Sequence, residues 1–274
     1  MIAGAKEKIK MSIEQPVPLR AMVSVRGLTK CYGARTILDG VNLDVAPGEK
    51  VALIGASGSG KTTILRLLMG LDRPDSGTME IDGRYLWHRE RNGNLEPADE
   101  RHARTVRRSV GMVFQQFNLF PHMTVLQNVA EPVIQVLRLS REAAHARAED
   151  LLAKVGLSCH LCHRPGQLSG GQQQRVAIAR SVALQPKVML FDEVTSALDP
   201  ELVGEVLRVM RDLAAATDMS MLIVTHEMSF AEDIANRVLM FDAGKIVEEG
   251  PPHTVLKRPN HPRTRQFLRA ILER

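Results

Sequence analysis

The 274-residue chain is predicted to adopt an α/β fold with a parallel-sheet core, an antiparallel sheet and an inserted helical segment. Three short apolar runs of strand type, at 51–54, 188–191 and 221–224, are each followed by a helical pattern, which is typical of a parallel sheet. Between residues 23 and 45, apolar and polar side chains alternate, as in strands buried on one face. From about 116 to 185 the apolar spacing is mostly helical.

Composition excludes several classes of protein. Apolar residues make up 44 % and charged residues 24 %, an ordinary globular balance. The net charge of +5, from 36 Lys+Arg against 31 Asp+Glu, is too small to indicate nucleic-acid binding by itself. No apolar run approaches the roughly 18 residues of a membrane span, and no secretory signal is recognisable. We therefore expect any membrane role to come through a partner, and we expect residues 1–21 to form a poorly ordered extension.

Tyr32 stands between the first two predicted strands, outside the apolar alternation. A tyrosine in this position can provide a stacking surface for a base. A half-buried surface tyrosine is an equally good interpretation of the spacing alone. The turn Pro47-Gly48 then leads into the strand at 51–54.

A glycine-rich loop follows that strand, and a helical pattern follows the loop. The loop reads Gly55-Ala56-Ser57-Gly58-Ser59-Gly60-Lys61-Thr62, and Thr63 continues the helix. Strand, loop and helix form the context in which G-x-x-x-x-G-K-[ST] binds phosphate, because backbone N–H groups and the helix dipole face the anion. Lys61 is predicted to reach the β- and γ-phosphates of a nucleotide, and the Thr62 hydroxyl to hold Mg²⁺. The alternative is a flexible glycine turn.

The stretch from Arg84 to Arg108 is charged, with seven arginines and four acids. It predicts a surface insertion with a solvated helix, and a binding patch is the alternative. Apolar residues then alternate at Val110, Met112 and Phe114, which predicts a strand that delivers Gln115 at its end.

The helical segment contains two predicted helix starts. Ser140 is predicted to cap one helix. A second begins at Leu168-Ser169-Gly170-Gly171-Gln172, where a capping serine and two glycines expose N–H groups. We interpret this as a second anion-binding site, although a plain helix cap explains the same residues.

Cys159-His160-Leu161-Cys162-His163 matches the pattern of c-type haem attachment and half of a zinc site. Haem attachment requires an exported chain, and a closed zinc site requires a fourth ligand. We expect neither haem nor zinc here. With Cys31 as the third cysteine, no disulfide framework is predicted, which fits a reducing compartment.

Polar residues follow the three buried strands. In open parallel sheets, ligands bind at the carboxyl ends of the strands, here near Gly55, Asp192 and His226. Asp192 is predicted to hold Mg²⁺ directly or through water, and Glu193 to orient or deprotonate an attacking water. His226 is predicted to contact the γ-phosphate, and Gln115 the metal or that water. The alternatives are solvated acids at a strand end and a structural histidine.

These motifs, in this order, resemble the ATP-binding subunits of ABC transporters, over about Met22 to Leu268. The family's motifs correspond to the A-loop Tyr32, Walker A 55–62, the Q-loop Gln115, the signature 168–172, Walker B ending at Asp192, the base Glu193, the D-loop 196–199 and the switch His226.

The resemblance implies a RecA-like P-loop NTPase core with an antiparallel β-subdomain, a helical subdomain at about 116–185 and a tail at 269–274. It implies that two copies enclose ATP and Mg²⁺ between Walker A of one and the signature of the other. Integral membrane permease subunits and an extracytoplasmic solute-binding protein are the implied partners, and nucleic acid is not. The implied location is peripheral, on the cytoplasmic face of the inner membrane.

The implied nucleotide-binding residues are Tyr32, Gly55, Ala56, Ser57, Gly58, Ser59, Gly60, Lys61, Thr62, Thr63, Ser169, Gly170, Gly171 and Gln172. The implied metal-binding residues are Thr62, Gln115 and Asp192, and the implied catalytic residues are Glu193, His226 and Gln115.

Two segments resemble the polar amino-acid importer branch: residues 192–200, with Val194 after Glu193, and residues 226–231. The charged stretch at 91–107 resembles the ectoine and hydroxyectoine importers. The alternative from another class is a soluble ABC-type ATPase acting on DNA or ribosomes. Such proteins usually carry a long coiled coil or two tandem cassettes, and this sequence shows neither. A nucleotide-binding regulator without turnover would lack the base Glu193.

Overall fold

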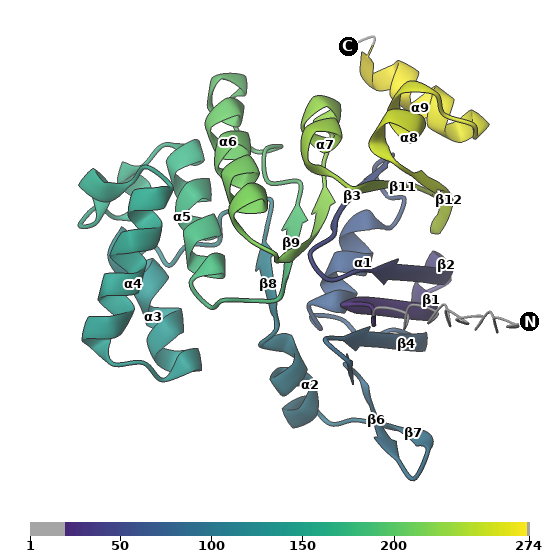
Figure 1. Cartoon of the computed structure of the whole chain (residues 1–274), viewed down its shortest axis with the longest axis horizontal. Helices are drawn as coiled ribbons and strands as arrows, with labels where there is room; N and C mark the ends of the chain where they lie inside the picture. Colours follow the sequence, from purple (N-terminus) through teal and green to yellow (C-terminus); the bar gives the residue numbers. More distant parts are fainter. Residues whose placement is uncertain (1–19, 273–274) are drawn as a thin grey trace, which may run out of the picture.

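The computed structural model describes residues 20–272, and a six-stranded sheet forms its core (Figure 1). The strand order is β12-β11-β3-β10-β9-β8; all neighbours run parallel except β12, which pairs antiparallel with β11. The strands are β3 (Lys50–Gly55), β8 (Val110–Val113), β9 (Val188–Asp192), β10 (Ser220–Val224), β11 (Arg237–Asp242) and β12 (Lys245–Gly250). The parallel core predicted from the apolar runs is confirmed. The extension expected at 1–21 lies, except for its last two residues, outside the described part.

The core strands are buried on both faces. In β9, Leu190 packs into one hydrophobic cluster, whereas Met189 and Phe191 pack into another on the opposite face. The strand predicted from Val110, Met112 and Phe114 is confirmed as β8, which ends at Val113. All four of its residues are buried, because helices pack on both sides of it.

One face of the core sheet is covered by α1 (Lys61–Leu68) and by a second, antiparallel sheet (Figure 1). That sheet has the order β2-β1-β4-β5, as the alternation between residues 23 and 45 predicts. Its strands are β1 (Val23–Tyr32), β2 (Arg35–Val45), β4 (Ser76–Ile81) and β5 (Arg84–Tyr85). The opposite face is covered by α6 (Pro200–Ala216), α7 (Met228–Ile234), α8 (Pro252–Lys257) and α9 (Pro262–Leu272). The boundary expected at residue 268 therefore falls within a helix.

The helices between β8 and β9 pack side by side beyond the edge of the sheet (Figure 1). They are α3 (Val125–Pro132), a π-helical turn (Val133–Leu137), α4 (Arg141–Lys154), 3₁₀ turns at Ser158–His160 and Pro165–Gln167, and α5 (Gly170–Val182). Ser140 caps α4 as predicted, since its hydroxyl accepts from the Ala143 N–H. These helices have their own hydrophobic cluster. In the part of the chain that the structure describes, no helix is long and apolar enough to cross a membrane.

The charged stretch Arg84–Arg108 contains more structure than its sequence predicts. The expected helix is α2 (Glu100–Arg107), but a hairpin of β6 (His88–Arg91) and β7 (Asn94–Pro97) precedes it. Its turn has Asn92 at φ 51° and Gly93 at φ 78°, which suits a two-residue hairpin loop. Leu86 and Trp87 are buried in the main cluster, so the insertion is anchored to the core.

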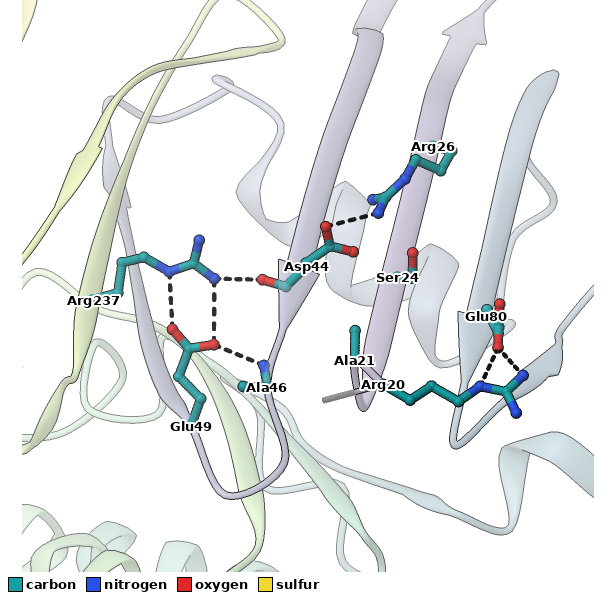
Figure 2. A pocket seen from close by; sticks show the side chains of 9 residues that line it. All are labelled: Arg20, Ala21, Ser24, Arg26, Asp44, Ala46, Glu49, Glu80 and Arg237. Carbon is teal, nitrogen blue, oxygen red and sulfur yellow. Dashed lines mark hydrogen bonds and ion pairs between the residues drawn. The ribbon is translucent and has the colours of Figure 1, made fainter. Parts of the chain in front are cut away.

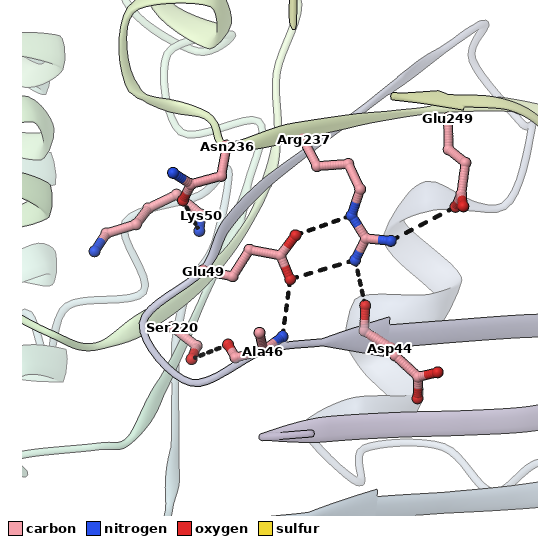
Figure 3. Close-up of polar contacts among 8 residues, drawn as sticks. All are labelled: Asp44, Ala46, Glu49, Lys50, Ser220, Asn236, Arg237 and Glu249. Carbon is pink, nitrogen blue, oxygen red and sulfur yellow. Dashed lines mark hydrogen bonds and ion pairs between the residues drawn. The ribbon is translucent and has the colours of Figure 1, made fainter. Parts of the chain in front are cut away.

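The turn between β2 and β3 joins the antiparallel sheet to the core, and a polar network fixes it (Figure 3). Arg237 donates from Nε to Glu49 Oε1 over 2.9 Å and also donates to the backbone oxygen of Asp44. The other Glu49 oxygen accepts from the Ala46 N–H over 2.8 Å. The network therefore ties the first residue of β11 to both ends of the turn.

Beside this network lies a shallow pocket of about 570 Å³ (Figure 2). Its arginines are paired with carboxylates: Arg20 with Glu80, Arg26 with Asp44, and Arg237 with Glu49. The pocket lies at the amino end of β3, which is about 17 Å from the glycine-rich loop at the carboxyl end. It is therefore separate from the predicted phosphate site.

Replacing Arg237 with alanine is expected to lower the free energy of unfolding by about 1–3 kcal/mol. Its side chain is 25 % exposed and that of Glu49 is 16 %, so the substitution leaves a partly buried carboxylate without its partner. Urea denaturation measures the change. Arg26→Ala is the matched control, because both side chains of the Arg26–Asp44 pair are at least half exposed. It should lose less than about 1 kcal/mol, and equal losses would contradict the structural role of Arg237.

Candidate functional site

The glycine-rich loop connects β3 to α1 and is packed closely between neighbouring strands. A Cβ on Gly55, which has φ 142°, would lie 2.2 Å from the backbone oxygen of Phe241 in β11. A Cβ on Gly60, at φ 108°, would lie 2.7 Å from a methyl carbon of Leu38 in β2. These two positions require glycine, so the loop holds its backbone in one tight conformation.

Lys61, the first residue of α1, lies across this loop. Its Nζ donates to the backbone oxygens of Gly55 (2.7 Å) and Ala56 (3.0 Å), and the residue is 4 % exposed. Burial lowers the pKa of Lys61, and the carboxylates of Glu193 and Asp192 oppose that shift. The ammonium group is thus held by the loop carbonyls, and it interacts electrostatically with the carboxylates of Asp192 and Glu193.

Thr62 and Asp192 meet although they are 130 residues apart. The Thr62 hydroxyl donates to Asp192 Oδ1 over 2.8 Å. Burial raises the pKa of Asp192, and the charge of Glu193 adds to the effect, while the bond from Thr62 opposes it. A hydroxyl and a carboxylate at one point are oxygen donors of the kind that Mg²⁺ prefers, so the pair fits this ion.

Glu193 and His226 form the second contact at this edge of the sheet. His226 Nε2 lies 3.0 Å from Glu193 Oε1. The hydrogen bond from His226 lowers the pKa of Glu193, and burial opposes that shift. Glu193 has φ 45°, and its N–H donates to Val224 O at the end of β10. The strained backbone and this bond direct the carboxylate toward the histidine.

Gln115 lies at the same edge without joining these contacts. In the sheet, Val113 of β8 pairs with Phe191 of β9, so Gln115 is level with Glu193 two residues further on. Gln115 is exposed, and among residues 20–272 no side-chain hydrogen bond links it to another predicted site residue.

The second glycine-rich helix start is well formed but lies apart. Ser169 Oγ accepts from the Gln172 N–H (3.3 Å), and Gln172 Oε1 accepts from the Ser169 N–H (2.9 Å), which is a capping box. A Cβ on Gly170 would lie 3.1 Å from Leu198, so α5 begins against the segment that follows β9. In Figure 1, α5 and α1 lie on opposite sides of β8 and β9. One chain therefore does not bring its two glycine-rich helix starts together.

Tyr32 is the last residue of β1, and its side chain is bonded outside the glycine-rich loop. Its hydroxyl donates to Asp72 over 3.0 Å, and the residue is 48 % exposed. In register it pairs with Arg35, whose guanidinium would contact a Cβ on Gly58 at 3.7 Å. Arg35 therefore lies beside the glycine-rich loop, a position that the sequence alone does not predict.

Comparisons with known proteins identify the family of this chain. The family model described as ABC transporter matches residues 38–196. A probable amino-acid ABC transporter ATP-binding protein of Sinorhizobium fredii is 56 % identical over 89 % of this chain and 95 % of its own length. An arginine transport ATP-binding protein of Corynebacterium glutamicum is 50 % identical over 92 % of this chain and 98 % of its own length.

Among solved structures, a dimeric ATP-binding cassette in a post-hydrolysis state, bound to ADP and Pi, superposes with a TM-score of 0.74. It is 35 % identical, and the match covers 84 % of this chain and 99 % of that one. The predicted fold class and the resemblance to amino-acid importer ATPases are confirmed, whereas the resemblance to ectoine importers stays a prediction. This chain belongs to the ABC transporter family, as one of its ATP-binding proteins.

Proposed function

We propose that this chain is the ATP-hydrolysing subunit of an ABC importer for polar amino acids or related solutes. The observation that carries the proposal is the grouping of Lys61, Thr62, Asp192, Glu193 and His226 at the carboxyl ends of β3, β9 and β10. The names of two relatives, one an amino-acid and one an arginine transport protein, support the solute class. These names favour a transport ATPase over an ATPase that acts on DNA or ribosomes.

In this proposal Thr62 and Asp192 hold Mg²⁺, and Gln115 is the third protein ligand. The ion, when bound, neutralises negative charge on the β- and γ-phosphates. Lys61 and the N–H groups of residues 55–63 bind the same phosphates. The raised pKa of Asp192 supports this assignment, because a buried carboxylate of this kind is stabilised by a nearby cation.

Glu193 is the group that takes a proton from the attacking water. The carboxylate is ionised at neutral pH, as a proton acceptor must be, and the hydrogen bond from His226 favours that charged form. His226 orients that carboxylate through the 3.0 Å contact and lies where it can also reach the γ-phosphate.

The remaining residues of the site come from a second copy of the chain. The start of α5 lies on the other side of β8 and β9 from α1 in Figure 1, so two chains facing head to tail would supply both halves of each site. The residues at that start are Ser169, Gly170, Gly171 and Gln172. The 35 % identical cassette was solved as a dimer, which supports this arrangement. Permease subunits in the membrane and an extracytoplasmic solute-binding protein complete the proposed importer, with this subunit peripheral on the cytoplasmic face.

Co-expression with a cognate permease is expected to bring this chain into the membrane fraction, because no described helix can cross a membrane by itself. Solute added to the complete complex, reconstituted with its solute-binding protein, should stimulate ATP hydrolysis. Permease subunits that bind a different cassette are the control. Recovery of the chain only on ribosomes or DNA would refute the proposal.

Tyr32→Ala is expected to weaken ATP binding by about 1–3 kcal/mol if the ring stacks on adenine, whereas Tyr32→Phe should lose little. Fluorescence titration with a nucleotide analogue measures the affinity. Tyr85→Ala is the matched control, because Tyr85 is the other tyrosine of the chain and lies on β5. Equal affinity of Tyr32→Ala and the unchanged chain would remove Tyr32 from the site.

A further inference from the structure

The segment Cys159-His160-Leu161-Cys162-His163 has no part in the proposed reaction, yet it precedes α5, whose start belongs to the proposed site. It connects α4 to α5 as two consecutive turns, with the His160 N–H donating to Leu157 O (3.0 Å) and the His163 N–H to His160 O (2.9 Å). Cys159 and Cys162 are both free and exposed. They are three residues apart in a helical turn, so their side chains leave the same side.

Contacts on both sides hold this segment. His160 Nε2 lies 3.3 Å from Gln172 Nε2, and the other atom of that amide, Oε1, completes the capping box at Ser169. The backbone oxygens of Leu161 and His163 accept from the first N–H groups of α3, those of Leu126 (3.1 Å) and Val125 (2.8 Å). The turn is therefore in direct contact with the start of α5 and with the start of α3.

We propose that Cys159 and Cys162 form an oxidisable thiol pair, and that their disulfide weakens the ATP-dependent dimer by disturbing the helix start at Ser169. The inference rests on the composite site proposed above, in which the glycine-rich loop comes from one chain and the helix start at Ser169 from the other.

The oxidant is a low-molecular-weight disulfide of the glutathione type. One cysteine thiolate attacks it and releases one glutathione thiolate; the second cysteine thiolate then attacks the cysteine sulfur of the mixed disulfide and releases the other. Two electrons pass from the two cysteine sulfurs to glutathione, which also takes up both protons.

The geometry explains why the turn must change. Residues three apart in a helical turn have Cβ atoms roughly 5–6 Å apart, whereas a disulfide needs about 3.5–4.5 Å. Closing the bond tightens the turn that contains His160 and Leu161. Leu161 packs against the hydrophobic cluster of the helical subdomain, so the exposed side of the turn yields and the ring of His160 shifts from Gln172. Without the contact from His160, the capping box between Ser169 and Gln172 is less firmly held. That capping box fixes the start of α5, where the N–H groups of the signature are exposed.

The experiment uses the full chain carrying Glu193→Gln, treated with glutathione disulfide and then freed of it. Intact mass is expected to fall by two hydrogen atoms, and dithiothreitol should restore it. Light scattering with Mg-ATP should show a dimer roughly fivefold weaker than the reduced one, the factor that corresponds to losing one helix cap. ATP affinity of the monomer should not change. Cys31→Ser should respond like the parent, and Cys159→Ser or Cys162→Ser should not form the internal disulfide.

Three outcomes overturn the proposal. They are glutathione adducts or intermolecular links in place of the internal disulfide, an internal disulfide that leaves the dimer unchanged, and about one zinc per chain bound through these cysteines. A reduced Glu193→Gln chain that stays monomeric with Mg-ATP would instead refute the composite site. The proposed effect of the disulfide on the dimer would then be refuted as well. The mass measurement on the thiols is independent of that result.

Discussion

Replacing Glu193 with glutamine is expected to slow ATP hydrolysis by 10²–10⁴-fold, roughly 3–5 kcal/mol of barrier. Glutamine keeps the shape of the side chain and its contact with His226, but it cannot accept a proton from water. The γ-phosphate of the bound ATP then persists. Because both chains contact it in the proposed site, the two chains should remain together. Steady-state phosphate release measures the rate, and light scattering should show a dimer with Mg-ATP and a monomer with ADP.

The matched control is Glu90→Gln, which makes the same chemical change at an exposed position in β6. It should hydrolyse ATP at the rate of the unchanged chain. A Glu193→Gln variant with nearly full activity would show that another group takes the proton. A variant that loses activity but stays monomeric with saturating Mg-ATP would contradict the shared site rather than the role of Glu193.

The residues at the strand ends could be predicted because local sequence determines their positions. Residues 51–54, 188–191 and 221–224 are apolar without interruption, so they form strands buried on both faces. Parallel strands end at the same edge of the sheet, which brings Gly55, Asp192 and the residues just after β10 close together. The capping of α5 by Ser169 follows in the same way from residues within one turn.

Features that depend on packing between distant segments could not be predicted. Arg35 reaches the glycine-rich loop only because the β1–β2 hairpin lies against it, and the sequence around Arg35 carries no pattern for that contact. The Arg237–Glu49 network joins residues 188 positions apart. The capping of α3 by the loop at 161–163 likewise arises from packing within the helical subdomain. Each is a tertiary contact between residues whose own neighbours predict only exposed charges or turns.

Ser169→Arg, added to Glu193→Gln, is expected to abolish the ATP-bound dimer. Ser169 is exposed at the start of α5, where two chains facing head to tail would bring it to the γ-phosphate of the other chain. A long arginine side chain there blocks the close approach and removes the hydroxyl that caps the helix. Light scattering with Mg-ATP should show a monomer. The nucleotide affinity of the single chain should stay largely unchanged, because α1, which carries Lys61 and Thr62, lies on the other side of β8 and β9 from α5 in Figure 1.

Two further variants test whether Ser169→Arg prevents dimerisation through its size and charge at the interface or through misfolding of the chain. Ser169→Asp, in the same background, keeps a side chain that caps helices well but places a negative charge against the phosphate, so it should also remain monomeric. Ala153→Arg adds the same long cation on an exposed face of α4, and it should dimerise normally. If Ser169→Asp and Ser169→Arg both dimerise as tightly as the parent, the second chain does not contribute its signature to the site. Loss of the dimer in Ala153→Arg as well would mean that added charge on the helical subdomain, rather than its position at Ser169, prevents association.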